Sequence, residues 1–215
     1  MTLWQRSLKR SFDIFFALIG IILCGGIILL CWVLATIDTR QNGMFTQLRV
    51  GKNGRLFRIM KIRTMRPIEG ITTVVTSRND PRITWLGSWL RRLKLDELPQ
   101  LFNVLLGHMS FVGPRPDVES FANLLLGEDR IILSIRPGIT GPATLAFRDE
   151  ETLLTKSEDP ERYNREVIFP AKTKLNRRYI EEYQFQKDIY YILITLFPGL
   201  QERLAAVLHL SPLQK

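Results

Sequence analysis

Apolar residues are concentrated in one long stretch near the start of the chain. Residues 14–37 contain no charged side chain. A helix needs about 20 apolar residues to cross a bilayer, so this stretch is long enough to insert. It is also too long for the core of a signal peptide, and no convincing small-residue cleavage site follows it. We therefore expect residues 1–39 to form a helix that is inserted in a membrane.

Basic residues flank this stretch on both sides, with Lys9 and Arg10 before it and Arg40 after it. The positive-inside rule places both flanks on the cytoplasmic side, which a single straight span cannot satisfy. Gly25-Gly26 lies at the centre, where glycines weaken a helix and let it bend. Two topologies are open: a re-entrant membrane helix hairpin that enters and leaves by the same face, and an ordinary single span.

Residues 45–50 and 56–64 are two apolar, strand-like blocks separated by Gly51-Lys52-Asn53-Gly54. This pattern predicts a small β-hairpin. Lys61 and Arg63 are two positions apart, so on a strand they point to the same side. Two cations on one face suit a phosphate, but a solvated edge strand that resists aggregation has the same pattern. The pattern alone does not separate these interpretations.

The spacing of apolar residues predicts a helix over residues 84–93, after an irregular loop at residues 66–78. Trp85 and Trp89 are four apart and share a face with Leu86 and Leu93, and basic residues crowd the end of the helix. Tryptophan beside basic residues is typical of an interfacial helix that lies among lipid headgroups. An amphipathic helix packed on a protein core gives a similar pattern. Both interpretations stay open.

Residues 95–101 place two adjacent carboxylates, Asp96 and Glu97, between basic residues and an apolar run. Pro99 suits the first turn of a helix, which we expect to continue to Gly107. Asp96 and Glu97 would then lie at the helix start, beside free backbone N–H groups that also attract phosphate. The simplest alternative is that Asp96 only caps the helix and Glu97 faces water.

Arg115 lies between two prolines, which hold its backbone extended. A stiff guanidinium is a good bidentate ligand for phosphate, although a rigid surface turn would also use the prolines. A turn-rich loop is expected at residues 137–142, and a charged, mostly helical stretch continues to about residue 176. Residues 189–197 are apolar but too short to span, so we expect them to dock on the domain or the bilayer surface.

Composition narrows the class of protein. The 215-residue chain is 46% hydrophobic and has a net charge of +9, which implies an anionic partner. Two cysteines within the apolar stretch and two isolated histidines give no zinc, disulfide or Ser-His pattern. The basic residues border apolar segments and no recognition motif occurs, so nucleic acid is a poor candidate. We expect an α+β, mostly helical protein: the inserted helix at 1–39 and one membrane-associated catalytic domain at 40–215.

Several short motifs follow one another along the chain: Lys9-Arg10-Ser11-Phe12-Asp13, Arg49-Val50-Gly51, Lys61-Ile62-Arg63-Thr64-Met65, Asp80-Pro81-Arg82, Leu95-Asp96-Glu97-Leu98-Pro99-Gln100-Leu101, Met109-Ser110, Gly113-Pro114-Arg115-Pro116 and Arg136-Pro137-Gly138-Ile139-Thr140-Gly141. In this order and spacing they resemble the bacterial sugar transferases, the monotopic polyprenyl-phosphate phosphoglycosyl transferases. The resemblance covers about residues 9–197, and the length of the chain resembles the family's minimal catalytic unit. One departure is Gly25-Gly26, where the family usually has Ser-Pro; glycines permit a bend without forcing one.

The resemblance implies transfer of a sugar 1-phosphate from a UDP-sugar to polyprenyl (undecaprenyl) phosphate, with release of UMP. It implies a location at the cytoplasmic face of the bacterial inner membrane and a role in starting exopolysaccharide, capsule, O-antigen or glycoconjugate synthesis. By resemblance, Asp96 is the nucleophile that carries the phosphosugar covalently. Glu97 would help hold Mg²⁺ or position the incoming group, and Asp96 and Glu97 are the expected metal ligands. The cations expected to contact phosphate are Lys61, Arg91 and Arg115, with Arg63 and Arg82 behind them.

A second class of function stays open, a basic membrane-bound module that docks anionic lipid or a partner without chemistry. The sequence does not name the sugar or the glycan, and it leaves a homodimer open. We expect the determinants of sugar specificity in the less patterned loops, at residues 66–78 and 140–151.

Overall fold

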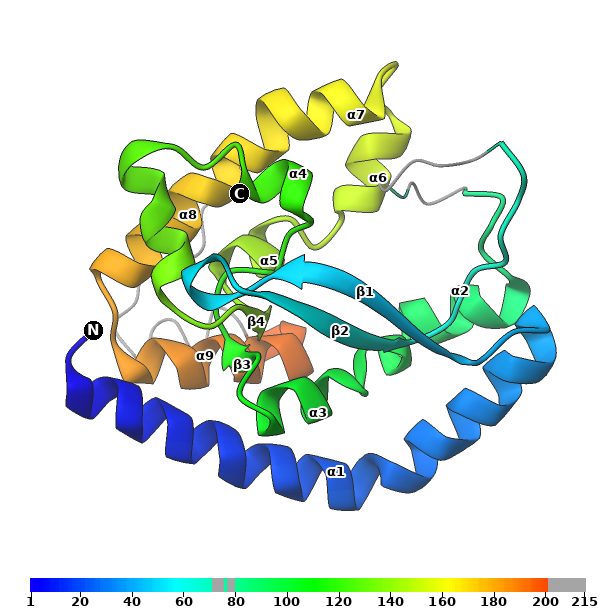
Figure 1. The fold of residues 1–215 in the computed structure, drawn as a ribbon, viewed down its shortest axis with the longest axis horizontal. Coiled ribbons are helices and arrows are strands. Elements are labelled where there is room, and N and C mark those ends of the chain that lie inside the picture. Colours follow the sequence, from blue (N-terminus) through cyan, green and yellow to red (C-terminus); the bar gives the residue numbers. More distant parts are fainter. Residues whose placement is uncertain (71–75, 77–79, 201–215) are drawn as a thin grey trace.

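The computed structural model describes residues 1–70, 76 and 80–200. Helices dominate these residues, and two small two-stranded sheets accompany them. This confirms the α+β, mostly helical fold class. In Figure 1 the long helix α1 runs along one side of the molecule, the β1–β2 hairpin crosses the middle, and α7 and α8 lie on the opposite side.

Helix α1 (Leu3–Thr39) is one uninterrupted helix. It begins with a capping box, in which the Thr2 hydroxyl accepts from the Gln5 backbone N–H at 3.2 Å and the Gln5 side chain accepts from the Thr2 N–H at 2.8 Å. Gly25-Gly26 lies within the helix, and the helix curves in Figure 1. The expected helix hairpin is therefore not confirmed; the bend is a curvature that keeps the helix intact.

The N-terminal half of α1 is fixed to the rest of the protein by buried polar contacts. The Lys9 ammonium lies 2.5 Å from the Asp188 carboxylate. The Asp13 carboxylate accepts from the Ser110 hydroxyl at 3.0 Å and from the Phe111 backbone N–H at 3.1 Å. Motif residues at the start of the chain thus anchor the helix.

The C-terminal half of α1 packs on the same body, since Cys31 and Ala35 share an apolar cluster with Ile62 and Leu90. Between the two anchored ends one face of the helix is exposed. Ile22 is 79% exposed, and no atom lies near the Cβ positions of the two central glycines. Among the described residues, α1 is the helix long and apolar enough to cross a membrane. This supports membrane association.

Strands β1 (Met44–Val50) and β2 (Leu56–Ile62) pair antiparallel around a short turn, η1 (Lys52–Gly54), which confirms the predicted hairpin. Alternate residues of β2 face the core, where Phe57 and Ile59 are buried.

Helix α2 (Trp85–Arg92) begins where the Thr84 hydroxyl accepts from the Gly87 N–H at 2.8 Å. Gly87 is required by packing, because a Cβ there would lie 2.1 Å from the Thr64 carbonyl oxygen. Leu86 turns with the buried Leu90 toward the apolar cluster that they share with α1. Trp85 and Trp89 are exposed, so the expectation that Leu86 shares their face is wrong.

A 3-10 turn, η2 (Leu95–Glu97), precedes helix α3 (Gln100–Leu105), and Gly107 follows with a φ of +82° that suits glycine. Strand β3 (Ser110–Val112) pairs in parallel with β4 (Gly138–Thr140). Sequence analysis assigned β4 to a loop because three residues are too few to show a period. Short elements lie between and after these strands: α4 (Glu119–Ala122), η3 (Gly127–Ser134) and α5 (Pro142–Ala146).

The C-terminal part is helical, as predicted, but it is divided. Its elements are α6 (Glu150–Thr155), α7 (Pro160–Tyr163), the π-helical turn η4 (Asn164–Ile168), α8 (Phe169–Glu181), α9 (Phe185–Leu196) and η5 (Pro198–Leu200). Helix α9 buries Tyr190 and Ile194 in the main core with Tyr179 of α8 and Val112 of β3. The short apolar segment therefore docks on the domain.

Candidate active site

Three separate parts of the chain meet at the end of β2. Asn103 joins α3 to β2, because its side chain accepts from the Met60 N–H at 2.9 Å and donates to the Arg58 carbonyl at 2.8 Å. Asn103 is fully buried, so these bonds are shielded from water. They hold α3, and the η2 turn before it, beside Lys61. The extended segment after β3 supplies Arg115.

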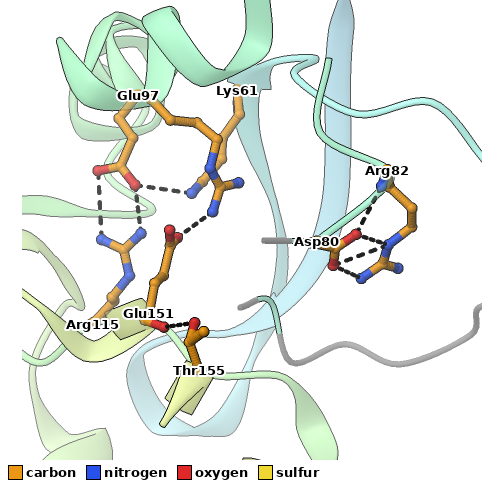
Figure 2. Close-up of polar contacts among 8 residues, drawn as sticks. Lys61, Asp80, Arg82, Glu97, Arg115, Glu151 and Thr155 are labelled. Carbon is orange, nitrogen blue, oxygen red and sulfur yellow. Dashed lines mark hydrogen bonds and ion pairs between the residues drawn. The ribbon is translucent and has the colours of Figure 1, made fainter. Parts of the chain in front are cut away.

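Glu97 is the centre of this cluster. Its Oε1 atom accepts from the Lys61 ammonium at 2.9 Å and from the Arg115 guanidinium, while Oε2 lies 3.5 Å from Arg115. Figure 2 shows Lys61 and Arg115 converging on this carboxylate. The alternative in which Glu97 faces water is therefore wrong.

The charges around Glu97 set its protonation. Burial alone would raise the pKa of Glu97, but the Arg115 and Lys61 charges and their hydrogen bonds bring it well below its ordinary value. The pKa of Arg115 is raised, chiefly by Glu97. Burial lowers the pKa of Lys61 against the opposing charge of Glu97. Glu97 is thus a firmly ionised carboxylate whose charge is already balanced.

Asp96, the neighbouring carboxylate, has the opposite surroundings. Asp96 is 6% exposed, and its Oδ1 atom is buried without a hydrogen-bond partner among the residues that the structure describes. Burial, and then the charge of Glu97, raise the pKa of Asp96. The positive charges of Lys61, Arg91 and Lys94 act in the other direction.

Asp96 does not cap a helix. It lies inside the η2 turn, which shows no side-chain cap hydrogen bond, and α3 begins four residues later at Gln100. The expectation that both carboxylates occupy a helix start is wrong, because Lys94 adopts a left-handed conformation and forms a separate turn. Two adjacent carboxylates with pKa values shifted in opposite directions are typical of groups that divide catalytic roles.

Arg91, the third predicted phosphate ligand, forms an ion pair with Glu151 of α6. Figure 2 places Glu151 beside the Glu97 cluster. Next to it, Glu150 lies 2.5 Å from the Lys172 ammonium of α8. Sequence analysis assigned most of the charges in this stretch to a solvated face, and no local pattern distinguishes Glu151 from its neighbours.

The structure does not bring the two remaining predicted cations into the cluster. Arg82 is held by Asp80, with contacts of 2.9 and 2.6 Å, and lies apart from Glu97 in Figure 2. Arg63 follows the end of β2 and donates to the Asn42 carbonyl at 2.8 Å, with its guanidinium over the Phe45 ring. Lys61 and Arg63 therefore do not form a shared phosphate clamp here, and a phosphate role for Arg63 or Arg82 stays a prediction.

Arg49 is a residue near the site that sequence analysis quoted only as part of a motif. Its guanidinium donates to Gln47 at 2.7 Å, and its Nε atom is buried without a partner among the described residues. Burial lowers the pKa of Arg49, followed by the nearby charge of Arg115. The motif Arg49-Val50-Gly51 was the available signal.

Metal binding can be tested on the donor atoms. No group of three or more His, Cys, Asp or Glu side chains that could hold a metal occurs in the described part of the chain. Asp96 Oδ1 lacks a hydrogen bond, and Glu97 Oε2 has one long contact. Two hard oxygens fit a Mg²⁺ ion that takes its other ligands from substrate phosphate and water.

The chain is similar in sequence to several known bacterial proteins. The UDP-glucose:undecaprenyl-phosphate glucose-1-phosphate transferase of Escherichia coli is 34% identical over 94% of this chain, which spans 42% of that protein. A galactosyl transferase of Streptococcus agalactiae is 36% identical over 87% of this chain and 41% of its own length. An exopolysaccharide production protein of Rhizobium leguminosarum is 40% identical over 64% of this chain and 73% of its own length.

This chain therefore spans about two fifths of the first two relatives. The sequence model of the family described as bacterial sugar transferase matches residues 4–202, which is most of the chain. The protein belongs to the bacterial sugar transferase family.

Proposed function

We propose that this protein transfers a sugar 1-phosphate from a UDP-sugar to a polyprenyl phosphate and releases UMP. One observation carries the proposal: Asp96 presents a buried carboxylate oxygen without a hydrogen bond, beside a Glu97 that is already neutralised by Lys61 and Arg115. The E. coli relative is named for this reaction with glucose as the sugar. Such a carboxylate has lone pairs free to react with an electrophile.

In the first step, an Asp96 oxygen attacks the phosphorus that carries the sugar. A bond from this oxygen to phosphorus forms, the bond from phosphorus to the bridging oxygen breaks, and UMP leaves with that oxygen. Both reactants are anions, so the approach needs positive charge at the reacting centre. Lys61, Arg91 and Arg115 supply it, and Arg91 must exchange Glu151 for phosphate to do so.

In the second step, a phosphate oxygen of the polyprenyl phosphate attacks the same phosphorus. The bond to Asp96 breaks, the carboxylate is regenerated, and the product is a polyprenyl diphosphate sugar. Splitting one displacement into two through a covalent intermediate lowers the barrier of each. A raised pKa of Asp96 fits this role, because a desolvated carboxylate is a better nucleophile than a fully hydrated one.

Asp96 and Glu97 are the residues that would hold Mg²⁺. When bound, the ion supplies charge neutralisation of the diphosphate and of the departing UMP. Glu97 keeps its ionised form in either state, because two cations stabilise it.

The contacts of α1 favour a re-entrant topology. Lys9 near one end and Ala35 near the other both pack on the same domain, so both ends belong on one side of the bilayer. The basic flanks place that side in the cytoplasm. The exposed Trp85 and Trp89 of α2 would lie among the headgroups, which brings the nearby site to the membrane surface. Tags at Met1 and Lys215 should both be accessible from the cytoplasm only; an N-terminal tag accessible from the periplasm would contradict this topology.

The proposed reaction is tested with the purified protein in detergent, Mg²⁺, polyprenyl phosphate and a panel of UDP-sugars. We expect UMP release with at least one UDP-sugar and none from Asp96→Asn with the same sugar. A binding module without chemistry releases no UMP from any of them. The active sugar would also identify the donor, for which the loop at residues 66–78 is a predicted determinant; most of that loop lies outside the described residues.

A further inference from the structure

A second group of cations lies at the other end of α3, away from Glu97. Arg10 of α1 donates to the Val104 carbonyl at 2.7 Å and to the Leu105 carbonyl at 2.9 Å. Arg136 donates through Nε to the Gly107 carbonyl at 2.8 Å. Both guanidiniums therefore bind the carbonyl end of α3, which carries partial negative charge.

Two more cations surround this pair. Lys52 lies on η1, which packs against η3 just before Arg136, and Arg6 lies one helical turn before Arg10. Burial lowers the pKa of Lys52, followed by the charges of Arg136 and Arg6. Arg10 and Arg136 meet at Gly107, where the Cβ position lies 3.3 Å from Arg10 Nη2 and 3.9 Å from Arg136 Nε. Positive side chains from three parts of the chain therefore gather at this end of α3.

Within the described residues, no carboxylate forms an ion pair with these four cations. In the part of the chain that the structure describes, no ion pair involves Arg6, Lys52 or Arg136, and neither Arg6 nor Lys52 forms a side-chain hydrogen bond. The Asp13 carboxylate in the same helix acts on Arg10, and it is held in place by Ser110 and Phe111. The repulsion among these cations persists in the folded protein, and a bound anion from outside the chain would relieve it.

The cluster is distinct from the active site. It occupies the turn end of the hairpin, whereas Lys61 is near the other end of β2. The five residue steps from Leu56 to Lys61 cover roughly 17 Å at 3.3 Å per residue. One phosphate cannot contact both groups.

The position along α1 indicates which anion binds. The first turn of α1 exposes Leu3 and Trp4, at 81% and 74%, and a lipid surface would cover both. Tryptophan next to basic residues, at the start of a helix that inserts in lipid, lies at the level of the headgroups. Arg6, two residues after Trp4, is therefore expected at the depth of phospholipid phosphates, and Lys52 lies near enough to sense its charge.

We propose that Arg6, Lys52 and Arg136 bind the phosphate of an anionic phospholipid headgroup and hold the N-terminal end of α1 at the membrane surface. Each basic residue near an anionic surface is worth roughly fivefold in affinity. The proposal requires α1 to insert in the membrane, but it does not depend on the transferase chemistry.

The test titrates the full-length protein in detergent with phosphatidylglycerol or phosphatidylcholine and counts bound lipids by native mass spectrometry. Arg6→Gln/Lys52→Gln removes two cations that form no side-chain bond, so folding is preserved. The matched control is Arg165→Gln/Lys174→Gln, two exposed cations on η4 and α8. We expect the wild type and the control to prefer phosphatidylglycerol, and the test variant to lose about 25-fold of that preference.

An unchanged preference in the test variant, or an equal loss in the control, would overturn the proposal. Inorganic phosphate added as a competitor distinguishes a free anion from a lipid: displacement of the lipid at millimolar phosphate would contradict a headgroup site. UMP release is measured in parallel, and we expect the test variant to retain it. Loss of UMP release in Asp96→Asn with intact lipid preference separates this proposal from the proposed reaction.

Discussion

Two buried aspartates, Asp188 and Asp96, differ in how their carboxylates are bound, which suits Asp188 to a structural role and Asp96 to the proposed chemistry. Asp188 is 1% exposed, and its oxygens accept from Lys9 at 2.5 Å, Tyr179 at 2.5 Å and Tyr183 at 3.1 Å. Asp96 is almost as buried, yet its Oδ1 accepts nothing within the described residues.

The difference lies in where each positive charge is placed. At Asp188 a lysine binds the carboxylate directly, so α1 is fastened to α9 and little acceptor capacity is left. At Asp96 the cations Lys61 and Arg115 bind the neighbour Glu97 instead. A buried carboxylate with all its acceptors filled holds elements together, whereas one with an acceptor left open can react.

The largest effect should come from replacing Asp96, whose Oδ1 atom has no hydrogen-bond partner among the described residues. Asp96→Asn removes the proposed nucleophile, so UMP release should fall by roughly 10⁴-fold or more, as for other catalytic nucleophiles. The melting temperature should stay equal or rise, because burial already disfavours the charged form of Asp96. Activity and thermal unfolding of the same preparation check both statements. A variant that loses activity only because it unfolds would contradict the contrast with Asp188.

Replacing Asp188 should instead lower the stability of the protein. Asp188→Asn removes the ion-pair partner of the buried Lys9, which costs about 3–5 kcal/mol of unfolding free energy. Chemical unfolding in detergent measures it. Glu182→Gln is the control, because its ion pair with Arg178 is on the surface and should leave stability unchanged. Equal stability of wild type and Asp188→Asn would show that the ion pair does not fasten α1.

Removal of Mg²⁺ should lower the activity that depends on Asp96 and should leave the stability of the protein unchanged. A chelator should lower UMP release by roughly 10²–10³-fold, because the ion neutralises the diphosphate. Added Mg²⁺ should restore UMP release. The melting temperature should not change, because the positive charge at Asp188 comes from Lys9 and not from an ion. Full activity in excess chelator would exclude Asp96 and Glu97 as ligands of a required ion.

The smallest effect concerns the pH dependence. Asp96 must be ionised to attack, so its raised pKa places the acidic limb of UMP release above the ordinary range of an aspartate. Lys94→Asn removes a positive charge that lowers this pKa, and asparagine tolerates the left-handed backbone at this position. The limb should therefore move to higher pH, by a few tenths of a unit because Lys94 is exposed. Arg92→Gln, one turn away, should leave it in place.

The sequence predicted those features that depend on local patterns. The hairpin around Gly51-Lys52-Asn53-Gly54, helix α2 and the stop at Gly107 each carry a local signal, and all three occur. Asp96, Glu97, Lys61 and Arg115 were assigned to one site from their motifs, and the structure places the last three in direct contact.

Contacts between distant residues were not predictable in this way. Lys9 and Asp188 are 179 positions apart, and nothing local in either segment indicates the other. Glu151 is one of several acids in its stretch until folding brings α6 to Arg91. Arg63 is two positions after Lys61, a spacing that predicts a shared face on a strand. Strand β2 ends at Ile62, however, so the strand alternation does not extend to Arg63.

Trapping the covalent intermediate tests the central claim most directly. The protein is incubated with Mg²⁺ and its UDP-sugar without polyprenyl phosphate, and its intact mass is measured. The open carboxylate predicts a mass gain of one sugar phosphate, located on the peptide that contains Asp96, with one UMP released per protein. A mass gain that persists in Asp96→Asn, or transfer to lipid without any adduct or acceptor-independent UMP, would contradict the account.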